Sequence, residues 1–256
     1  GKFPGRFAIL GGGGVLNPML VSAAKSKTLD DKLRDRFIRA AHEVLDQGAV
    51  GFGEMMVEHF SMGAGHPHLS APADHLLLLL LADIAAERGV PIDIHMEAIE
   101  NEAGLPGGRY KSPPNPARLS PNIAAFERLL VHNPNARIVW AHLGWDNTGQ
   151  RTPVLMRRLL AKHNNLYVHF KMGGDSLNVN KPMAQGQGLL PEWLKLIEDF
   201  PDRFMVGSDQ FYVTPRSQKR FPQHTKPMRK LIDQLSPDLA RKVGLDNASV
   251  VYNLNK

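Results

Sequence analysis

The chain has 256 residues, of which 43% are hydrophobic, and 31 Lys or Arg against 25 Asp or Glu give it a formal net charge of +6. It contains no cysteine, so disulfides and thiolate metal sites are excluded, and a bound metal would have to be held by His and carboxylate side chains. The length suits a single α/β barrel, and we expect one domain over residues 1–256.

Short apolar runs alternate with helix-like segments along the chain. The runs are rich in Ile, Val and Phe, as is typical of parallel strands that helices cover. The expected strands are residues 7–10, 49–53, 91–95, 137–142, 166–170 and 203–207. The expected helices are residues 29–47, 73–88, 122–132, 153–163 and 191–200. This alternation predicts a parallel α/β fold.

Six strands are two fewer than a closed eight-stranded barrel needs. Three explanations stay open: an open sheet, two strand-helix units upstream of Gly1, or strands that escape the pattern. We favour the upstream units. The expected fold is therefore a TIM (β/α)8-type barrel of which about six strand-helix units are visible.

Three of the expected strands end at, or are closely followed by, a side chain that can bind a metal or transfer a proton: His95, His142 and Asp209. The carboxyl ends of all strands in a barrel face one mouth, so these side chains should converge there. Two imidazoles and a carboxylate suit a divalent metal, which lowers the pKa of a bound water and polarises a carbonyl. Asp209 would then carry the proton from the nucleophile to the leaving group.

An ordered set of motifs resembles the amidohydrolase superfamily of metal-dependent TIM-barrel hydrolases, in particular its amidohydrolase-2 branch. The set covers roughly residues 50 to 250 and consists of residues 51–54 (GFGE), 90–95 (VPIDIH), 138–144 (IVWAHLG), 206–209 (VGSD) and 245–248 (LDNA). The resemblance implies that Glu54, His95, His142 and Asp209 lie at the ends of the fourth, fifth, sixth and eighth strands.

The expected function is that of a metal-dependent hydrolase, which cleaves an amide, lactone or related ester bond of a small molecule with a metal-activated water. We expect His95, His142, Asp209 and Glu54 as metal ligands, and Asp209 and His142 as catalytic residues. The expected cofactor is a divalent metal, zinc first, with manganese or iron left open, because His and carboxylate suit all three.

The chain departs from the family pattern in one respect. The family's first strand supplies a His-x-His pair, and the only such pair here is His66-Pro67-His68, in a segment of loop composition. Two other functions therefore stay open: nonoxidative decarboxylation of an aromatic carboxylate on the same scaffold, and a non-catalytic binding protein whose metal site has decayed. A third, weaker hypothesis is a metal-free enzyme for a phosphorylated substrate, for which the glycines at residues 11–14 would be the phosphate-binding feature. We instead expect these glycines to form a flexible loop at the mouth of the barrel.

Residues just beyond the strands are candidates for substrate binding, although each also suits a loop that packs on the rim or a solvated charge. They are Trp145, Asp146, Arg216, His66 and His68. His169 and Lys171 share one face of the strand at 166–170 by its two-residue period, and the sequence does not decide whether this face points into the barrel.

The expected partner is a small-molecule substrate, without nucleic acid or membrane, and a homo-oligomer is left open. All of the net positive charge comes from residues 211–256, with nine Lys or Arg against three Asp, but these lack the interleaved aromatics of a nucleic-acid platform. The apolar run at residues 76–82 is far shorter than the roughly 20 residues of a membrane span. The compartment stays open, with the cytoplasm favoured.

Overall fold

The computed structural model describes residues 5, 7–26, 29–63, 65–108, 110–172, 180–184, 188–209 and 225–254. The strands are β1 (Leu10–Gly12), β2 (Gly51–His59), β3 (Leu69–Ser70), β4 (Pro91–Met96), β5 (Ala103–Gly104), β6 (Arg118–Leu119), β7 (Arg137–Leu143), β8 (Leu166–Phe170), β9 (Met183–Ala184), β10 (Gly188–Leu189) and β11 (Phe204–Val206).

The helices lie mostly between successive strands of the main sheet. They are α1 (Gly13–Ser26), α2 (Asp31–Asp46), α3 (Leu76–Arg88), α4 (Ile123–His132), α5 (Pro153–Lys162), α6 (Pro191–Asp199), α7 (Thr225–Ile232), α8 (Pro237–Arg241) and α9 (Asn247–Val251), with a π-helical turn at Lys242–Asp246 between the last two. Among the described helices, none has the length and apolar character that crossing a membrane requires.

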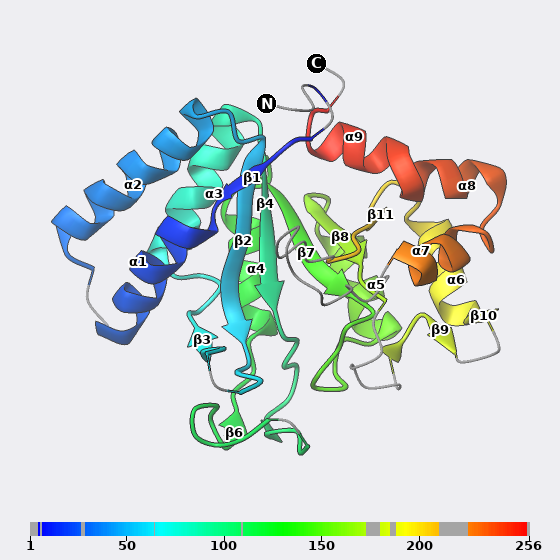
Figure 1. Ribbon diagram of the computed structural model, residues 1–256, viewed down its shortest axis with the longest axis horizontal. Helices are drawn as coiled ribbons and strands as arrows, with labels where there is room; N and C mark the ends of the chain where they lie inside the picture. Colours follow the sequence, from blue (N-terminus) through cyan, green and yellow to red (C-terminus); the bar gives the residue numbers. More distant parts are fainter. Residues whose placement is uncertain are drawn as a thin grey trace, which may run out of the picture.

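The main sheet has the strand order β1-β2-β4-β7-β8-β11, and all neighbours in this order are parallel. Figure 1 shows the strands running side by side with their carboxyl ends downward and the helices packed around the outside. Within the described part of the chain, β1 and β11 end the sheet and do not pair with each other, so the barrel is not closed. The predicted parallel α/β architecture of the TIM-barrel type is confirmed.

Local signals place several helix ends where the sequence suggested. The Thr152 side chain accepts a hydrogen bond from the Leu155 N–H and caps α5, which begins with Pro153. Gly89 ends α3 in the left-handed conformation, with φ of +63°. These ends fix the entry of α5 and the connection from α3 into β4.

The glycines at residues 11–14 correct one prediction, because they do not form a loop at the mouth. Gly11 and Gly12 belong to β1, and Gly13 and Gly14 begin α1. Glycine and an internal proline, Pro18, both disfavour a helix, so the local pattern gave no sign of α1. Burial of Leu16 and Leu20, which have no exposed surface, outweighs that preference.

The interior between the sheet and the helices holds one large apolar cluster, in which Trp140 of β7 packs against Phe126 of α4 with ring centroids 4.9 Å apart. The other face of the sheet carries a smaller cluster of Val139, Met205 and Val251. Because Val139 and Trp140 are neighbours in β7, their opposite packing shows which face of the strand points into the barrel.

Candidate metal centre

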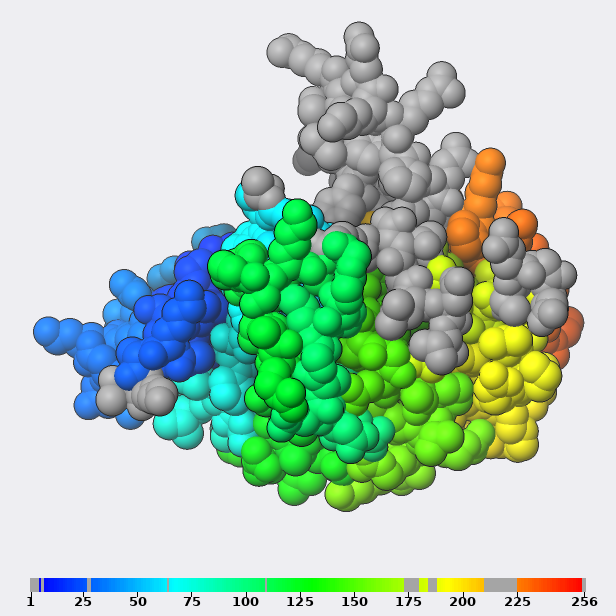
Figure 2. Space-filling model, turned by 90° about the horizontal axis from the view of Figure 1, so that it is seen from below, coloured from blue at the N-terminus to red at the C-terminus, as the bar shows by residue number. Residues whose placement is uncertain are grey.

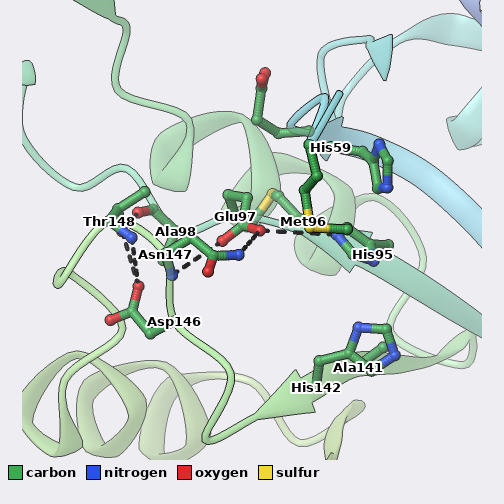
Figure 3. Close-up of polar contacts among 12 residues, drawn as sticks. His59, His95, Met96, Glu97, Ala98, Ala141, His142, Asp146, Asn147 and Thr148 are labelled. Carbon is green, nitrogen blue, oxygen red and sulfur yellow. Dashed lines mark hydrogen bonds and ion pairs between the residues drawn. The ribbon is translucent and has the colours of Figure 1, made fainter. Parts of the chain in front are cut away.

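Three of the predicted site residues converge at the carboxyl half of the sheet. Glu54 comes from β2, His95 from β4 and His142 from β7, and they offer ligand atoms that all lie within 4.8 Å of one another. The Glu54 Oε1 atom lies 3.3 Å from the His95 Nδ1 and 3.2 Å from the His142 Nε2. Figure 3 shows His95 and His142 on two neighbouring strands, β4 and β7.

His142 reaches this group through an unusual backbone conformation. Strand alternation would send its side chain to the helix side, like that of Trp140, two residues before it. Instead, His142 has φ of +66°, in the left-handed region that residues other than glycine rarely adopt. Such strain clusters at functional sites, since the fold must hold it in place.

Asp209 lies beside this group but not within it. Its Oδ2 atom is 3.9 Å from the His142 Nε2, and it forms an ion pair with Lys171. Asp209 also has a positive φ, of +46°, three residues after β11 ends. The Lys171 ammonium lies 3.8 Å from the centre of the Trp145 ring, so Trp145, Lys171 and Asp209 form a row at one side of the histidines.

The two histidines have opposite electrostatic surroundings. Burial lowers the pKa of His95, but hydrogen bonds and charge from Glu54 and Glu97 outweigh it and raise this pKa to about 9. Burial lowers the pKa of His142 well below its ordinary value, and the charges of His95 and Lys171 act in the same direction. For Glu54, burial raises the pKa, but the bond to His95 and the nearby cations lower it on balance, so the carboxylate is ionised.

This donor set fits a divalent metal. Ligand atoms around a tetrahedral ion with bonds of about 2.0–2.1 Å lie about 3.3 Å apart, the spacing of Glu54 from the two imidazoles. The Nε2 atom of His142 is the one that faces Glu54, and the low pKa of His142 leaves its imidazole neutral, the form that binds metals. The raised pKa of His95 reflects the negative charge of Glu54 and Glu97 beside its imidazole.

A pocket of about 340 Å³ opens beside the group, on the inner face of the sheet. It is lined by Glu54, Asp93, His142, His169 and Asp209, together with residues of β11 and α9. His169 therefore faces the barrel interior, which answers the question that the two-residue period left open. Asp93 accepts a hydrogen bond of 2.8 Å from the Tyr252 hydroxyl, which joins α9 to the floor of this pocket.

Asn17 and His59 are site residues that the sequence analysis did not single out. The Asn17 side chain donates to the Glu54 carbonyl over 2.8 Å and accepts from the Met56 N–H over 2.9 Å, so α1 holds the backbone beneath Glu54. The His59 ring lies 4.8 Å from that of His95. The unpredicted helix hid Asn17. Strict alternation along β2 would put His59 on the face of Met55 and Val57, which pack in the core, and the register shift between Met56 and Glu58 therefore hid His59.

The histidine pair in the loop after β2 divides between two places. His66 lines a second pocket, of about 780 Å³, and its ring lies 4.4 Å from that of His59. His68 instead pairs with Glu58, with its Nε2 atom 2.9 Å from the carboxylate.

Figure 2 looks from the carboxyl ends of the strands and shows the green loop that carries β5 and β6 standing forward on this face.

The remaining predicted substrate residues differ in position. Trp145 lies against Lys171, next to the histidines. Asp146 is 2% exposed, and its carboxylate accepts bonds from the backbone N–H groups of its own loop and from Asn180. Figure 3 places Asp146 well apart from His95 and His142. Arg216 lies outside the described residues, and its predicted role stays a prediction.

A model of the amidohydrolase family (Amidohydro_2) matches residues 28–254, which is most of the chain. The chain belongs to this amidohydrolase family, as its motifs predicted. No curated protein matches it.

Several solved structures are similar to this one at low sequence identity. An amidohydrolase 2 from Bifidobacterium longum subsp. infantis is 14% identical with a TM-score of 0.40, and the match covers 71% of this chain and 57% of that protein. A dihydroorotase from Campylobacter jejuni is 15% identical with a TM-score of 0.48, covering 86% and 62%. A dihydroxybenzoic acid decarboxylase from Polaromonas, with bound manganese and an inhibitor, is 16% identical with a TM-score of 0.43, covering 95% and 75%. The chain thus spans less than two thirds of the length of the first two proteins.

Proposed function

We propose that this protein is a metal-dependent hydrolase that cleaves an amide, lactone or related ester bond of a small molecule. The observation that carries the proposal is the convergence of Glu54, His95 and His142 on one point, with Asp209 beside them. Membership of the amidohydrolase family supports it. Zinc is the first choice of metal, with manganese and iron as the alternatives.

Glu54, His95 and His142 would hold the ion, and Asp209 would complete or adjoin its ligand set. A divalent ion so held supplies a water of lowered pKa and polarises the substrate carbonyl. The Asp209 carboxylate takes a proton from the attacking water and returns it to the leaving group. Lys171 fixes Asp209 through their ion pair, and the Trp145 ring offers an apolar face for the substrate.

Nonoxidative decarboxylation is the second candidate, favoured by the buried Lys171. Its ammonium lies between the Asp209 carboxylate and the Trp145 ring, so an aromatic carboxylate could stack on Trp145 with its anionic group beside Lys171. The bond from the ring to the carboxylate would break, carbon dioxide would leave, and the ring carbon would receive a proton. Release of carbon dioxide from such substrates, with no hydrolysis of lactones or amides, would select this reaction.

Metal content, measured by elemental mass spectrometry after dialysis against metal-free buffer, tests the proposal. We expect about one equivalent of a transition metal in the wild-type chain, since one ion fits the three convergent ligands. Glu54→Gln should lose it, whereas Glu58→Gln should retain it, because Glu58 lies in the same strand but pairs with His68 outside the group.

His142→Ala should abolish turnover of any lactone, amide or aromatic carboxylate that the wild-type protein accepts, while the fold persists. A wild-type chain that neither contains metal nor takes up zinc or manganese would remove the proposed function and leave the binding-protein alternative. An active, metal-replete His142→Ala variant would remove His142 from the site.

A further inference from the structure

The backbone of β7 changes its course just before His142. The pairing of β7 with β4 ends at Trp140, and its pairing with β8 shifts register between Trp140 and Leu143. The left-handed turn at His142 falls within this irregularity, and it brings the imidazole to Glu54. Something outside the strand ladder must therefore hold this segment, because the left-handed conformation is unfavourable for a residue with a side chain.

The Arg151 side chain is bonded to this segment. Its guanidinium donates one hydrogen bond of 2.6 Å to the carbonyl of Ala141 and another of 3.0 Å to the carbonyl of Trp140. It also stacks on the Trp140 ring, 4.0 Å from the centroid. The two carbonyls belong to the peptide units that lead into His142, so one rigid, forked group fixes the backbone on its amino side.

The Arg151 side chain is a buried cation, and burial of a charge is unfavourable. It is 3% exposed, and burial lowers its pKa to about 9, although Asp146 and Glu97 oppose this effect. Among the described residues, no carboxylate forms an ion pair with the guanidinium, which contacts two backbone carbonyls and an aromatic ring. A buried cation that binds backbone in place of a counter-charge suggests a geometric role for Arg151.

The loop after β7 in turn fixes Arg151. Its backbone N–H donates to the Asp146 Oδ2 over 2.9 Å, and the other oxygen of Asp146 accepts from the Gly149 N–H over 3.0 Å. Asp146 therefore organises the loop from which Arg151 returns to the strand. The residue that the sequence pattern suggested as a substrate ligand is connected to His142 through Arg151.

We propose that Arg151 is a positioning residue, which locks the left-handed backbone at His142 and so aims the His142 imidazole at Glu54. The inference deepens the proposed function, because it explains how one histidine reaches the candidate metal centre. The locking itself is a property of the backbone, and it does not depend on whether a metal binds. The two parts can therefore be tested separately.

The locking is tested without metal, by chemical denaturation in the presence of a chelator. Where the fold imposes a left-handed conformation, glycine is favoured over alanine by about 1 kcal/mol, or about fivefold in the folding equilibrium constant. In the protein that retains Arg151, we expect the folding equilibrium constant of His142→Gly to exceed that of His142→Ala by this factor. In the Arg151→Met background the advantage should disappear, since the backbone is free to relax.

The aiming is tested with cobalt(II), whose visible absorption reports the ligand geometry. Arg151→Met should change the spectrum of the cobalt-loaded protein and weaken cobalt binding at least about tenfold, by analogy with other residues that orient metal ligands. Arg151→Lys should retain part of the wild-type cobalt spectrum and cobalt affinity, because the lysine ammonium can still donate to the carbonyls of Trp140 and Ala141. If Arg151→Met does not fold, Arg151→Lys and Arg151→Gln replace it, ranked by the donors that they keep.

Arg137→Met is the matched control. Arg137 lies at the other end of β7, and its guanidinium also donates to a backbone carbonyl, that of Val250, over 3.0 Å. We expect this variant to lose stability while the cobalt spectrum and the Gly/Ala ratio at position 142 stay as in the wild-type protein. Equal changes in both arginine variants would reduce Arg151 to a general stabilising role and overturn the inference.

The outcomes separate the two proposals. If wild-type protein binds no cobalt but the Gly/Ala advantage depends on Arg151, the metal function fails and the locking stands. If cobalt binds and neither its spectrum nor the Gly/Ala ratio responds to Arg151, the metal function stands and the inference falls.

Discussion

At the amino end of β4 the chain needs a left-handed residue and uses a glycine, Gly89, with φ of +63°. At the carboxyl end of β7, the next strand of the sheet, it needs the same conformation and uses His142, with φ of +66°. The amino end thus follows backbone preference, whereas the carboxyl end accepts strain in order to present an imidazole. In barrels of this type, residues at the carboxyl end serve chemistry and those at the amino end serve stability.

The interior packing differs in the same way. On the amino side, Val139, Met205 and Val251 form an apolar cluster in which none is more than 1% exposed. On the carboxyl side, the same inner face carries the half-buried His169 and the buried Lys171, which are polar or charged groups. Changes on the two sides should consequently alter different measurements.

The largest expected effect belongs to the carboxyl side and concerns the pH dependence of metal binding. The pKa of His95 is raised to about 9, so this imidazole is protonated at neutral pH and must release its proton to an incoming ion. Affinity for zinc should therefore rise about tenfold per pH unit between roughly pH 6 and 8, and level off above the pKa. The lowered pKa of His142 adds no further dependence, because that imidazole is already neutral.

Competition with a chromophoric chelator at several pH values measures this slope, and Glu97→Gln sharpens the test. The Glu97 carboxylate helps to raise the pKa of His95, so its loss should bring the levelling-off to lower pH. A zinc affinity that does not change between pH 6 and 8 would contradict the assignment of His95 as a ligand.

The next effect belongs to the amino side. Val251→Ala removes two buried methyl groups from the cluster and should lower the free energy of unfolding by about 2 kcal/mol. Its neighbour Val250 is 66% exposed, and Val250→Ala should change the unfolding free energy by less than about 0.5 kcal/mol. Urea denaturation measures both, and metal content should stay at the wild-type level in both. Loss of metal in Val251→Ala would show that the two sides are not independent.

The sequence predicts the strands well because parallel strands between helices are continuous apolar runs, and Leu166–Phe170 agrees to the residue. It also indicates that Glu54, His95 and His142 meet, since the carboxyl ends of parallel strands face one mouth. It does not predict α1, whose glycines and proline are overruled by tertiary burial.

Long-range contacts explain what the sequence left undecided at the site. The direction of His142 depends on a backbone angle, which no hydrophobic period encodes. The loop-bound position of Asp146 depends on N–H groups that follow it and on Asn180, 34 residues away. The direction of Lys171 depends on which face of β8 is the inner one. The packing of Val168 and Phe170 against the helices defines that face, and the sequence alone does not.

The smallest expected effect tests the glycine side of the comparison directly. Gly89→Ala puts a Cβ atom into open space but into a left-handed backbone, so it should lower the unfolding free energy by about 1 kcal/mol through conformation alone. Gly14→Ala is the counterpart, because Gly14 lies in the first turn of α1, also with open space around a Cβ atom. There alanine should stabilise the protein by about 0.5 kcal/mol, since glycine disfavours a helix. Changes of opposite sign in the unfolding free energy, measured by urea denaturation, would show that the backbone angle decides whether alanine destabilises the protein. Changes of the same sign would remove the basis for comparing Gly89 with His142.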